Sequence, residues 1–218
     1  MPVDLATAAV LYALSLCAAA AGSEIIEHLY RREPEVLSYP ATVTKRSRWR
    51  IIILHWGLFL YMLLVVLLAQ KLPPMEGCVF IAERLCIGWA LWLTICTDFE
   101  QHVIFDRMLA PLAIVVLLFD VINGVPVLRH IGAMLVGFGI FLVLAAITRG
   151  GIGGGDIKLV ALLGLWCGKK LFPVLVIGLI LAGIAALIFL LTKRKSRREF
   201  LAYGPYFAGA ALYIMATP

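Results

Sequence analysis

Two aspartates, Asp98 and Asp156, are the residues of this chain whose type and placement best fit a chemical role. Asp156 follows a stretch in which five of six residues are glycine (150–155), and an apolar run follows it. The glycines allow close approach of another peptide backbone. In a strongly apolar chain an ionisable side chain is costly, and its default interpretation is functional. We therefore predict that Asp156 is one half of a catalytic pair.

Asp98, which closes another apolar stretch, is the predicted second half. Two neighbouring carboxylates can cleave an amide through water: the ionised one accepts a proton from the water, and the protonated one polarises the scissile carbonyl. Because like charges resist joint ionisation, the pair shares one proton and titrates as a unit. This chemistry requires neither metal nor cofactor, and we predict none.

Structural roles fit the same residues. Asp156 or Asp106 could cap the helix that it begins, and for Asp106 the cap is the favoured interpretation. Asp98 could be a polar residue at a helix end near the membrane surface. Glu100 and His102 are expected to be solvated loop residues. The alternatives for Asp98 and Asp156 are left open by residue type alone.

Other hydrolytic mechanisms lack the motifs or the partner residues that they require. No His-Glu-x-x-His motif is present for zinc, and no Gly-Lys-Ser/Thr follows the glycines as a phosphate loop requires. Ser15 and Ser23 fall in an apolar stretch that contains no histidine to activate them. Cys96 ends an apolar helix, whereas a nucleophilic cysteine needs a polarised site. A carboxylate pair is therefore the favoured mechanism.

The composition indicates the elements that must position these residues. Of the 218 residues, 63% are hydrophobic and 15% are charged, which is typical of a protein that crosses the membrane several times. The net charge of +6 comes mostly from basic residues in loops, so membrane topology explains it better than nucleic acid does. The expected partner is a lipid bilayer, and no nucleic-acid partner is expected. The sequence says nothing about the oligomeric state.

We predict an all-α, polytopic integral membrane helix bundle with about eight transmembrane spans, and at least six. A span needs about 20 apolar residues, so little room remains for a soluble domain. The predicted spans are 5–26, 51–70, 78–97, 108–122, 127–148, 156–168, 171–192 and 201–217.

The loops between these spans predict the orientation of the chain. If the polar loop at 27–50 is cytoplasmic, that side carries fourteen Lys and Arg residues and the other side carries five. Cytoplasmic loops are normally the more basic ones. Two predicted spans separate Asp98 from Asp156, and an even number returns the chain to the same side. Both carboxylates are therefore expected at the cytoplasmic face.

Three motifs resemble the type IV prepilin peptidase family of GxGD aspartic proteases, over roughly residues 79–218. The first is an Asp followed eight residues later by another, Asp98 and Asp106. The second and third are Gly153-x-Gly155-Asp156-x-Lys158-Leu159 and Tyr203-Gly204-Pro205-Tyr206. The chain departs from the family in having Ile104-Phe105-Asp106 where Leu-Pro-Asp is common. We divide it into an N-terminal membrane region (1–78) with the basic loop and a peptidase-like membrane core (79–218).

The resemblance implies that Asp98 and Asp156 are catalytic and that Gly153, Gly155, Lys158 and Asp106 support the loop. It implies a hydrolase of the bacterial inner membrane that removes the basic leader from type IV prepilins or from pseudopilins of type II secretion, on the cytoplasmic side. Many members also methylate the product and carry two Cys-x-x-Cys pairs in the first cytoplasmic loop. No cysteine lies between 27 and 50, so neither zinc nor methyl transfer is expected.

Two other functions fit some of these residues. A GxGD protease that cuts other transmembrane peptides is the nearest competitor. A small proton- or cation-coupled transporter would also use intramembrane carboxylates and a broken helix. A transporter should hold its acidic groups near the bilayer midplane, whereas both aspartates here are predicted at one face. The favoured hypothesis is therefore the membrane aspartic endopeptidase.

Overall fold

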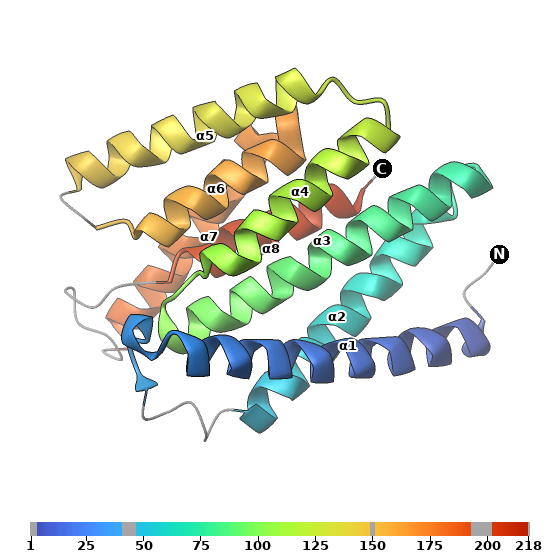
Figure 1. Ribbon diagram of the computed structural model, residues 1–218, viewed down its shortest axis with the longest axis horizontal. Helices are drawn as coiled ribbons and strands as arrows, with labels where there is room; N and C mark the ends of the chain where they lie inside the picture. Colours follow the sequence, from blue (N-terminus) through green and yellow to red (C-terminus); the bar gives the residue numbers. More distant parts are fainter. Residues whose placement is uncertain (1–3, 41–46, 149–150, 193–201, 218) are drawn as a thin grey trace. The chain divides into compact units, whose positions relative to one another are not determined.

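The computed structural model describes residues 4–40, 47–148, 151–192 and 202–217. The described residues form eight α-helices and two short 3₁₀ helices, η1 and η3, and include no β-strand (Figure 1). This confirms the predicted all-α class. The chain divides into two compact units. Unit 1 is Met1–Val103 with Met215–Pro218, and unit 2 is Ile104–Ile214.

The compact units are defined by packing. The predicted division at residue 78 rests instead on how far the sequence resemblance extends, and it stays a prediction.

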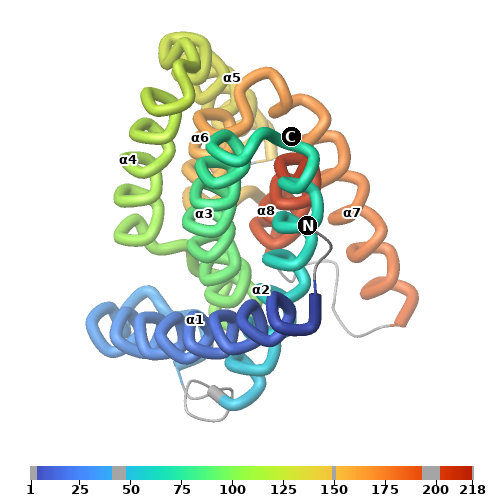
Figure 2. The backbone as a smooth tube through the Cα atoms, turned by 90° about the vertical axis from the view of Figure 1, so that its right-hand side faces the viewer, coloured from blue at the N-terminus to red at the C-terminus, as the bar shows by residue number. Residues whose placement is uncertain are grey.

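Unit 1 contains three long helices. These are α1 (Leu5–Arg32), α2 (Ser47–Ala69) and α3 (Pro74–Gln101), with η1 (Pro34–Val36) between the first two. Helix α2 packs against both α1 and α3 (Figure 2). Leu11 of α1 forms a small buried cluster with Leu58 and Met62 of α2. Gly57 and Gly88 leave room for aromatic rings of the facing helix, because a Cβ at either position would overlap Trp92 or Tyr61.

Unit 2 begins with α4 (Asp106–Ile122) and α5 (Val127–Ile147), which are joined by a turn at Gly124 with φ of 64°. Then come α6 (Gly154–Cys167), η3 (Gly168–Lys170), α7 (Leu171–Leu191) and α8 (Gly204–Ala216), whose last two residues belong to unit 1. Helix α5 lies along α6, as both views show (Figures 1 and 2). Their contact is close at Gly164 of α6, where a Cβ would lie 2.7 Å from the carbonyl oxygen of Ala133 and 2.8 Å from Cα of Met134.

Gly164→Ala is expected to destabilise unit 2, because the new methyl group meets the backbone of α5, which cannot rotate away as a side chain can. Overpacking of this kind costs about 1–3 kcal/mol. Gly139→Ala on α5 is the matched control, since a Cβ there meets nothing within 4 Å and alanine favours a helix. The midpoint of thermal unfolding in detergent should fall only for Gly164→Ala. Equal midpoints would contradict the close packing of α5 on α6.

The helices coincide with the predicted spans, but several run further. Helix α3 continues to Gln101, past the predicted end at 97, and α1 continues to Arg32, past 26. Five helical segments are long and apolar enough to cross a membrane: Leu5–Arg32, Arg48–Ala69, Pro74–Gln101, Val127–Ile147 and Gly154–Leu191. The chain is therefore a multi-pass membrane protein. The count of eight spans stays a prediction, because α4, α6 and α8 have only 17, 14 and 13 residues.

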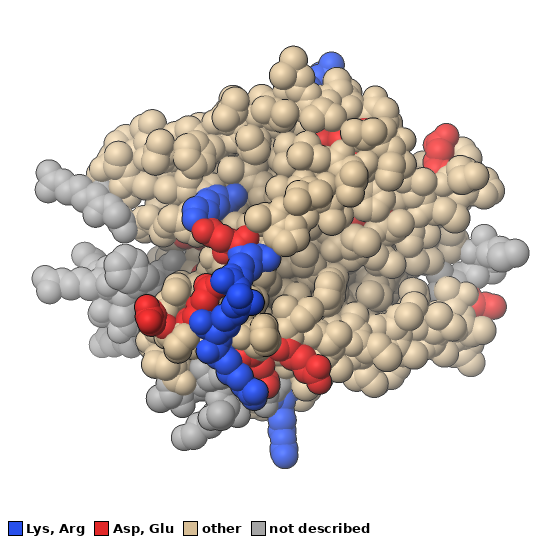
Figure 3. Space-filling model, in the orientation of Figure 1, with Lys and Arg blue, Asp and Glu red and all other residues tan. Residues whose placement is uncertain are grey.

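The surface agrees with a lipid environment. Most of the face seen in Figure 3 is uncharged. Large apolar side chains such as Leu128, Ile147 and Phe172 are more than 70% exposed. Several basic residues on which the predicted orientation rests, namely Lys45, Arg46, Arg149 and those at 193–198, lie outside the described residues. The cytoplasmic position of the loops stays a prediction.

Candidate active site

Asp98 lies in the last turn of α3. The helix ends where His102 adopts the left-handed conformation, with φ of 53°, and the backbone N–H of His102 donates to the carbonyl oxygen of Asp98 at 2.9 Å. Asp98 is 5% exposed. The polar segment expected to begin at Asp98 is thus helical for one further turn. The carboxylate is carried by a regular, well-defined element.

Glu100 is buried, so the expectation that it is a solvated loop residue is wrong. Its carboxylate accepts hydrogen bonds from Arg50 Nε at 3.0 Å and from the hydroxyl of Tyr30 at 3.0 Å. Arg50 Nη2 lies 2.8 Å from Glu100 Oε2, and the Arg50 side chain is fully buried. Because the helix continues past Asp98, residue 100 faces α1 and α2 instead of water. Helices α1 and α2 are thereby tied to the last turn of α3.

A second attachment joins the polar loop to the same turn. The Gln101 amide makes two hydrogen bonds with the backbone of Tyr39: it accepts from the N–H at 2.8 Å and donates to the C=O at 3.1 Å. The rings of Tyr39 and His102 lie 5.7 Å apart in an edge-to-face arrangement. Glu100 and Gln101 together fix the end of α3. The sequence contained the signal for neither contact, since the partners are 50 to 70 residues away.

Asp156 lies in the first turn of α6, whose N-cap is Gly153. The backbone N–H groups of Gly153 and Gly204 lie near its carboxylate. An acidic side chain in the first turn faces the N-cap N–H in this way in a capping box, so Asp156 also suits a structural role in α6. The proximity of Gly204 brings the glycine segment to the start of α8. Two segments singled out in the sequence, 153–158 and 203–206, therefore meet at Asp156.

The glycines of this segment differ in their surroundings. A Cβ on Gly155 would lie 3.0 Å from Cβ of Ile104, which is tighter than normal contact. A Cβ on Gly153 would lie 3.4 Å from Oδ2 of Asp156, whereas one on Gly154 meets nothing within 4 Å. Gly155 thus lets the first turn of α6 lie directly against the residue that precedes Phe105 and α4.

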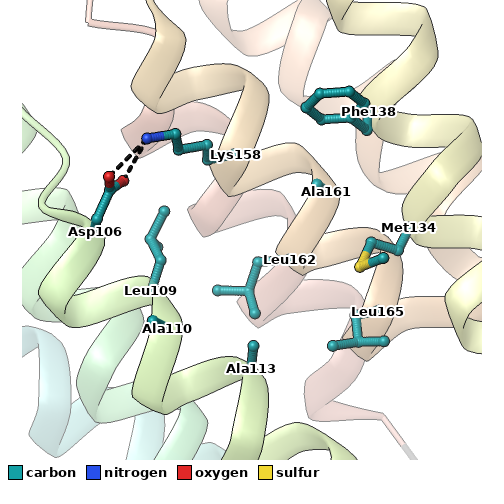
Figure 4. Close-up of a pocket in the computed structure, with 10 residues that line it drawn as sticks. All are labelled: Asp106, Leu109, Ala110, Ala113, Met134, Phe138, Lys158, Ala161, Leu162 and Leu165. Atoms are coloured by element: carbon teal, nitrogen blue, oxygen red, sulfur yellow. Dashed lines mark hydrogen bonds and ion pairs between the residues drawn. The ribbon is translucent and has the colours of Figure 1, made fainter.

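Asp106 and Lys158 form an ion pair, with Lys158 Nζ 2.8 Å from Oδ1 and 2.7 Å from Oδ2 of Asp106 (Figure 4). Their side chains are 66% and 54% exposed. Asp106 is the first residue of α4, and the N-cap is Phe105, so the favoured interpretation of Asp106 as a helix cap is wrong. The carboxylate binds across to α6 instead. Two of the predicted supporting residues are therefore in direct contact.

Comparison with known proteins gives one family match. The model described as the type IV leader peptidase family matches residues 85–191, a segment that holds Asp98, Asp106 and the whole glycine motif. Residues 85–191 place the chain in the type IV leader peptidase family. This confirms the resemblance seen in the sequence.

Curated relatives of this chain carry the name prepilin leader peptidase/N-methyltransferase. The protein from Aeromonas salmonicida is 30% identical over 153 residues, which cover 67% of this chain and 52% of the relative. That from Bacillus subtilis is 38% identical over 77 residues, covering 35% and 31%, and that from Neisseria gonorrhoeae is 31% identical over 114 residues, covering 50% and 39%. The chain spans about half the length of the Aeromonas relative. No solved structure shows a significant match.

Each candidate catalytic aspartate lies in a different compact unit. Asp98 belongs to unit 1, and Asp156 belongs to unit 2 with Gly153, Gly155, Lys158 and Asp106. The pairing of the two carboxylates is a prediction from the sequence. Among the described residues no three His, Cys, Asp or Glu side chains are grouped as ligands for a metal ion.

A serine and a histidine do meet in unit 1, which the sequence analysis did not expect. Ser15 Oγ lies 3.0 Å from Nδ1 of His55, which comes from the neighbouring helix α2. The Ser15 hydroxyl, however, donates its single proton to the carbonyl oxygen of Tyr12 at 2.8 Å. His55 must then donate to Ser15, whereas a general base must accept from its nucleophile. The polarity of this pair is opposite to that of a serine hydrolase.

Proposed function

We propose that this chain is a membrane aspartic endopeptidase that removes the basic leader from prepilins or pseudopilins. The observation that carries the proposal is that the family match at 85–191 includes both Asp98 and Asp156. The Asp156 carboxylate also lies near backbone N–H groups of two motifs of the resemblance, those of Gly153 and Gly204. Leader cleavage would occur at the cytoplasmic face of the bacterial inner membrane. The distribution of Lys and Arg among the loops predicts that Asp98 and Asp156 lie at this face.

The proposed reaction uses the two carboxylates and one water. One aspartate, ionised, takes a proton from the water as it attacks the scissile carbonyl. The other, protonated, donates a hydrogen bond to the carbonyl oxygen and then gives the proton to the departing amine. The backbone N–H groups of Gly153 and Gly204 would orient the Asp156 carboxylate. Rate should depend on pH in a bell shape, because one carboxyl must be ionised while the other stays protonated.

The positions of the aspartates in their helices favour a protease over a transporter. Asp98 lies in the last turn of α3, and Asp156 lies in the first turn of α6. Ion-coupled transporters hold such groups near the bilayer midplane, in the interrupted middle of a helix.

The direct test is cleavage by the purified chain in proteoliposomes. Candidate prepilins with a basic leader, and a transmembrane peptide without one, would be incubated separately and the products identified by intact mass. We expect cleavage of the prepilin at the leader junction and none of the other peptide. Cleavage of both would indicate a general intramembrane protease, and cleavage of neither would refute the peptidase.

The same assay tests methyl transfer. The named relatives are leader peptidase/N-methyltransferases, whereas we propose cleavage alone for this chain because the loop at 27–50 has no cysteine. With S-adenosylmethionine present, the mature product should keep its unmodified mass. A gain of one methyl group on the new N-terminus would overturn this part of the proposal.

Gly155→Ala is expected to lower kcat for cleavage about tenfold, because even a small displacement of a reacting group is costly. The methyl group would push against Ile104 and displace the turn that carries Asp156. Gly154→Ala is the matched control, as the space beside it is open. Its kcat should match that of the unmodified protein. A similar kcat for both variants would refute a specific role for Gly155.

A further inference from the structure

Unit 2 has an open groove of about 500 Å³ that is not part of the Asp156 turn itself. Helix α4 forms one wall, α5 the other and α6 the floor (Figure 4). From α5, Met134 and Phe138 line the groove one helical turn apart. Apart from one ion pair, every lining residue is apolar. The groove therefore offers an apolar channel between helices.

The lining residues of α4 form a single stripe. Asp106, Leu109, Ala110 and Ala113 follow the spacing i, i+3, i+4, i+7, which places them on one face of the helix. The stripe begins with a carboxylate and continues with apolar and small side chains. Two of the four side chains are alanine methyl groups, which are small enough for another helix backbone to approach α4 closely.

Helix α6 repeats the same pattern. Lys158, Ala161, Leu162 and Leu165 also follow i, i+3, i+4, i+7 and begin with a charged residue. The two charged residues pair with each other, so both stripes have their polar end on the same side. Asp156 lies two residues before Lys158, in the first turn of α6. The polar end of the groove is thus the end nearest to the candidate catalytic carboxylate.

We propose that this groove binds the apolar helix of the substrate, with the residues that precede this helix at the Asp106–Lys158 end. The proposal rests on the proposed function and adds where the substrate lies. A substrate with a basic leader followed by an apolar helix matches the groove in both parts. The helix fits the apolar, alanine-lined channel, and a leader cation can bind Asp106, whose side chain is 66% exposed.

The charge at the polar end argues against a lipid as the intended occupant. An acyl chain needs no carboxylate, and the Asp106–Lys158 pair presents no net charge to an anionic headgroup. For a bound leader, in contrast, Asp106 is an attractive partner. The ion pair adds little to stability, since exposed pairs of this kind contribute at most about 1 kcal/mol. Its position at the head of both stripes is better explained by recognition.

The test is kinetic. Ala113→Leu and Ala161→Leu would fill the groove, and each should raise KM for a cleaved prepilin about tenfold while kcat stays within about twofold. Ala146→Leu, an exposed position of α5 outside the groove, is the matched control and should leave KM unchanged. Unchanged KM in both groove variants, with the parent protein active, would overturn the groove while leaving the peptidase intact. A parent protein that cleaves no prepilin would refute the proposed function instead.

A second measurement does not depend on folding of the groove variants. The inactive Asp156→Asn protein would be mixed with a prepilin carrying a photoreactive phenylalanine analogue in its apolar helix, in vesicles of neutral lipid. Cross-links that map to α4 or α6 along the two stripes would support the proposal. Cross-links that map only to other helices, or only to lipid, would overturn it.

Discussion

Asp98→Asn and Asp156→Asn are each expected to abolish leader cleavage, with kcat lowered by roughly 10²- to 10⁴-fold or more. An amide cannot exchange the proton that the reaction requires, although it has nearly the shape of the carboxyl group. The double variant should be no slower than either single variant, because residues that act as one unit are not additive. The measurement is single-turnover cleavage of a prepilin in proteoliposomes.

Asp4→Asn is the matched control for this pair. Asp4 caps α1 by accepting a hydrogen bond from the backbone N–H of Thr7 at 2.8 Å, and asparagine caps a helix equally well. The control should therefore retain full activity. Loss of cleavage in only one of the two catalytic variants would reject the paired mechanism, since each carboxyl is required in the proposed reaction.

Much of the fold could be predicted from the sequence, because apolar runs of span length and turn residues mark helices strongly. Residues 123–126 separate α4 from α5, whereas α3 begins at Pro74, four residues before the predicted start at 78. Helix ends in polar sequence were harder to predict. Helix α3 continues past Asp98 because Arg50 and Tyr30 bind the Glu100 carboxylate, and hydropathy does not record such partners.

The candidate site could be predicted only in part, for the same reason. The glycine run before Asp156 marks this residue as a candidate from the sequence pattern alone. The segment with Gly204 could also be recognised as a motif. Contacts across long sequence separations could not be predicted: Asp106 with Lys158, 52 residues apart, and Arg50 with Glu100, 50 apart. Neither a charge in a loop nor a charge at a helix end indicates its partner.

These two ion pairs differ in how strongly each charge depends on its partner. Asp106 and Lys158 are both more than half exposed, so water solvates the two charges and either can exchange its partner for another. Arg50 and Glu100 lie at 0% and 11% side-chain exposure, so each charge depends on the other. The exposed pair suits recognition, whereas the buried pair suits a fixed position for the end of α3.

Arg50→Met is therefore expected to destabilise unit 1 by about 3–5 kcal/mol. The substitution leaves the Glu100 carboxylate buried, with the Tyr30 hydroxyl as a neutral partner and no counter-charge on Arg50. Loss of the pair also frees the last turn of α3, so cleavage should fall with stability. The free energy of unfolding would be measured by denaturant titration in mixed micelles.

Arg31→Met is the matched control, because the Arg31 side chain is 83% exposed and its pair with Glu27, at 3.9 Å, has the same charges. That change should cost less than about 1 kcal/mol. The double variant Arg50→Met/Glu100→Gln should recover most of the stability, since position 100 no longer carries a buried charge and glutamine still accepts a hydrogen bond from Tyr30. If Arg50→Met were as mild as Arg31→Met, the buried pair could not be what holds the end of α3. If the double variant recovered stability but not cleavage, the Arg50–Glu100 pair would have a second role, which is to position Asp98 in the folded protein.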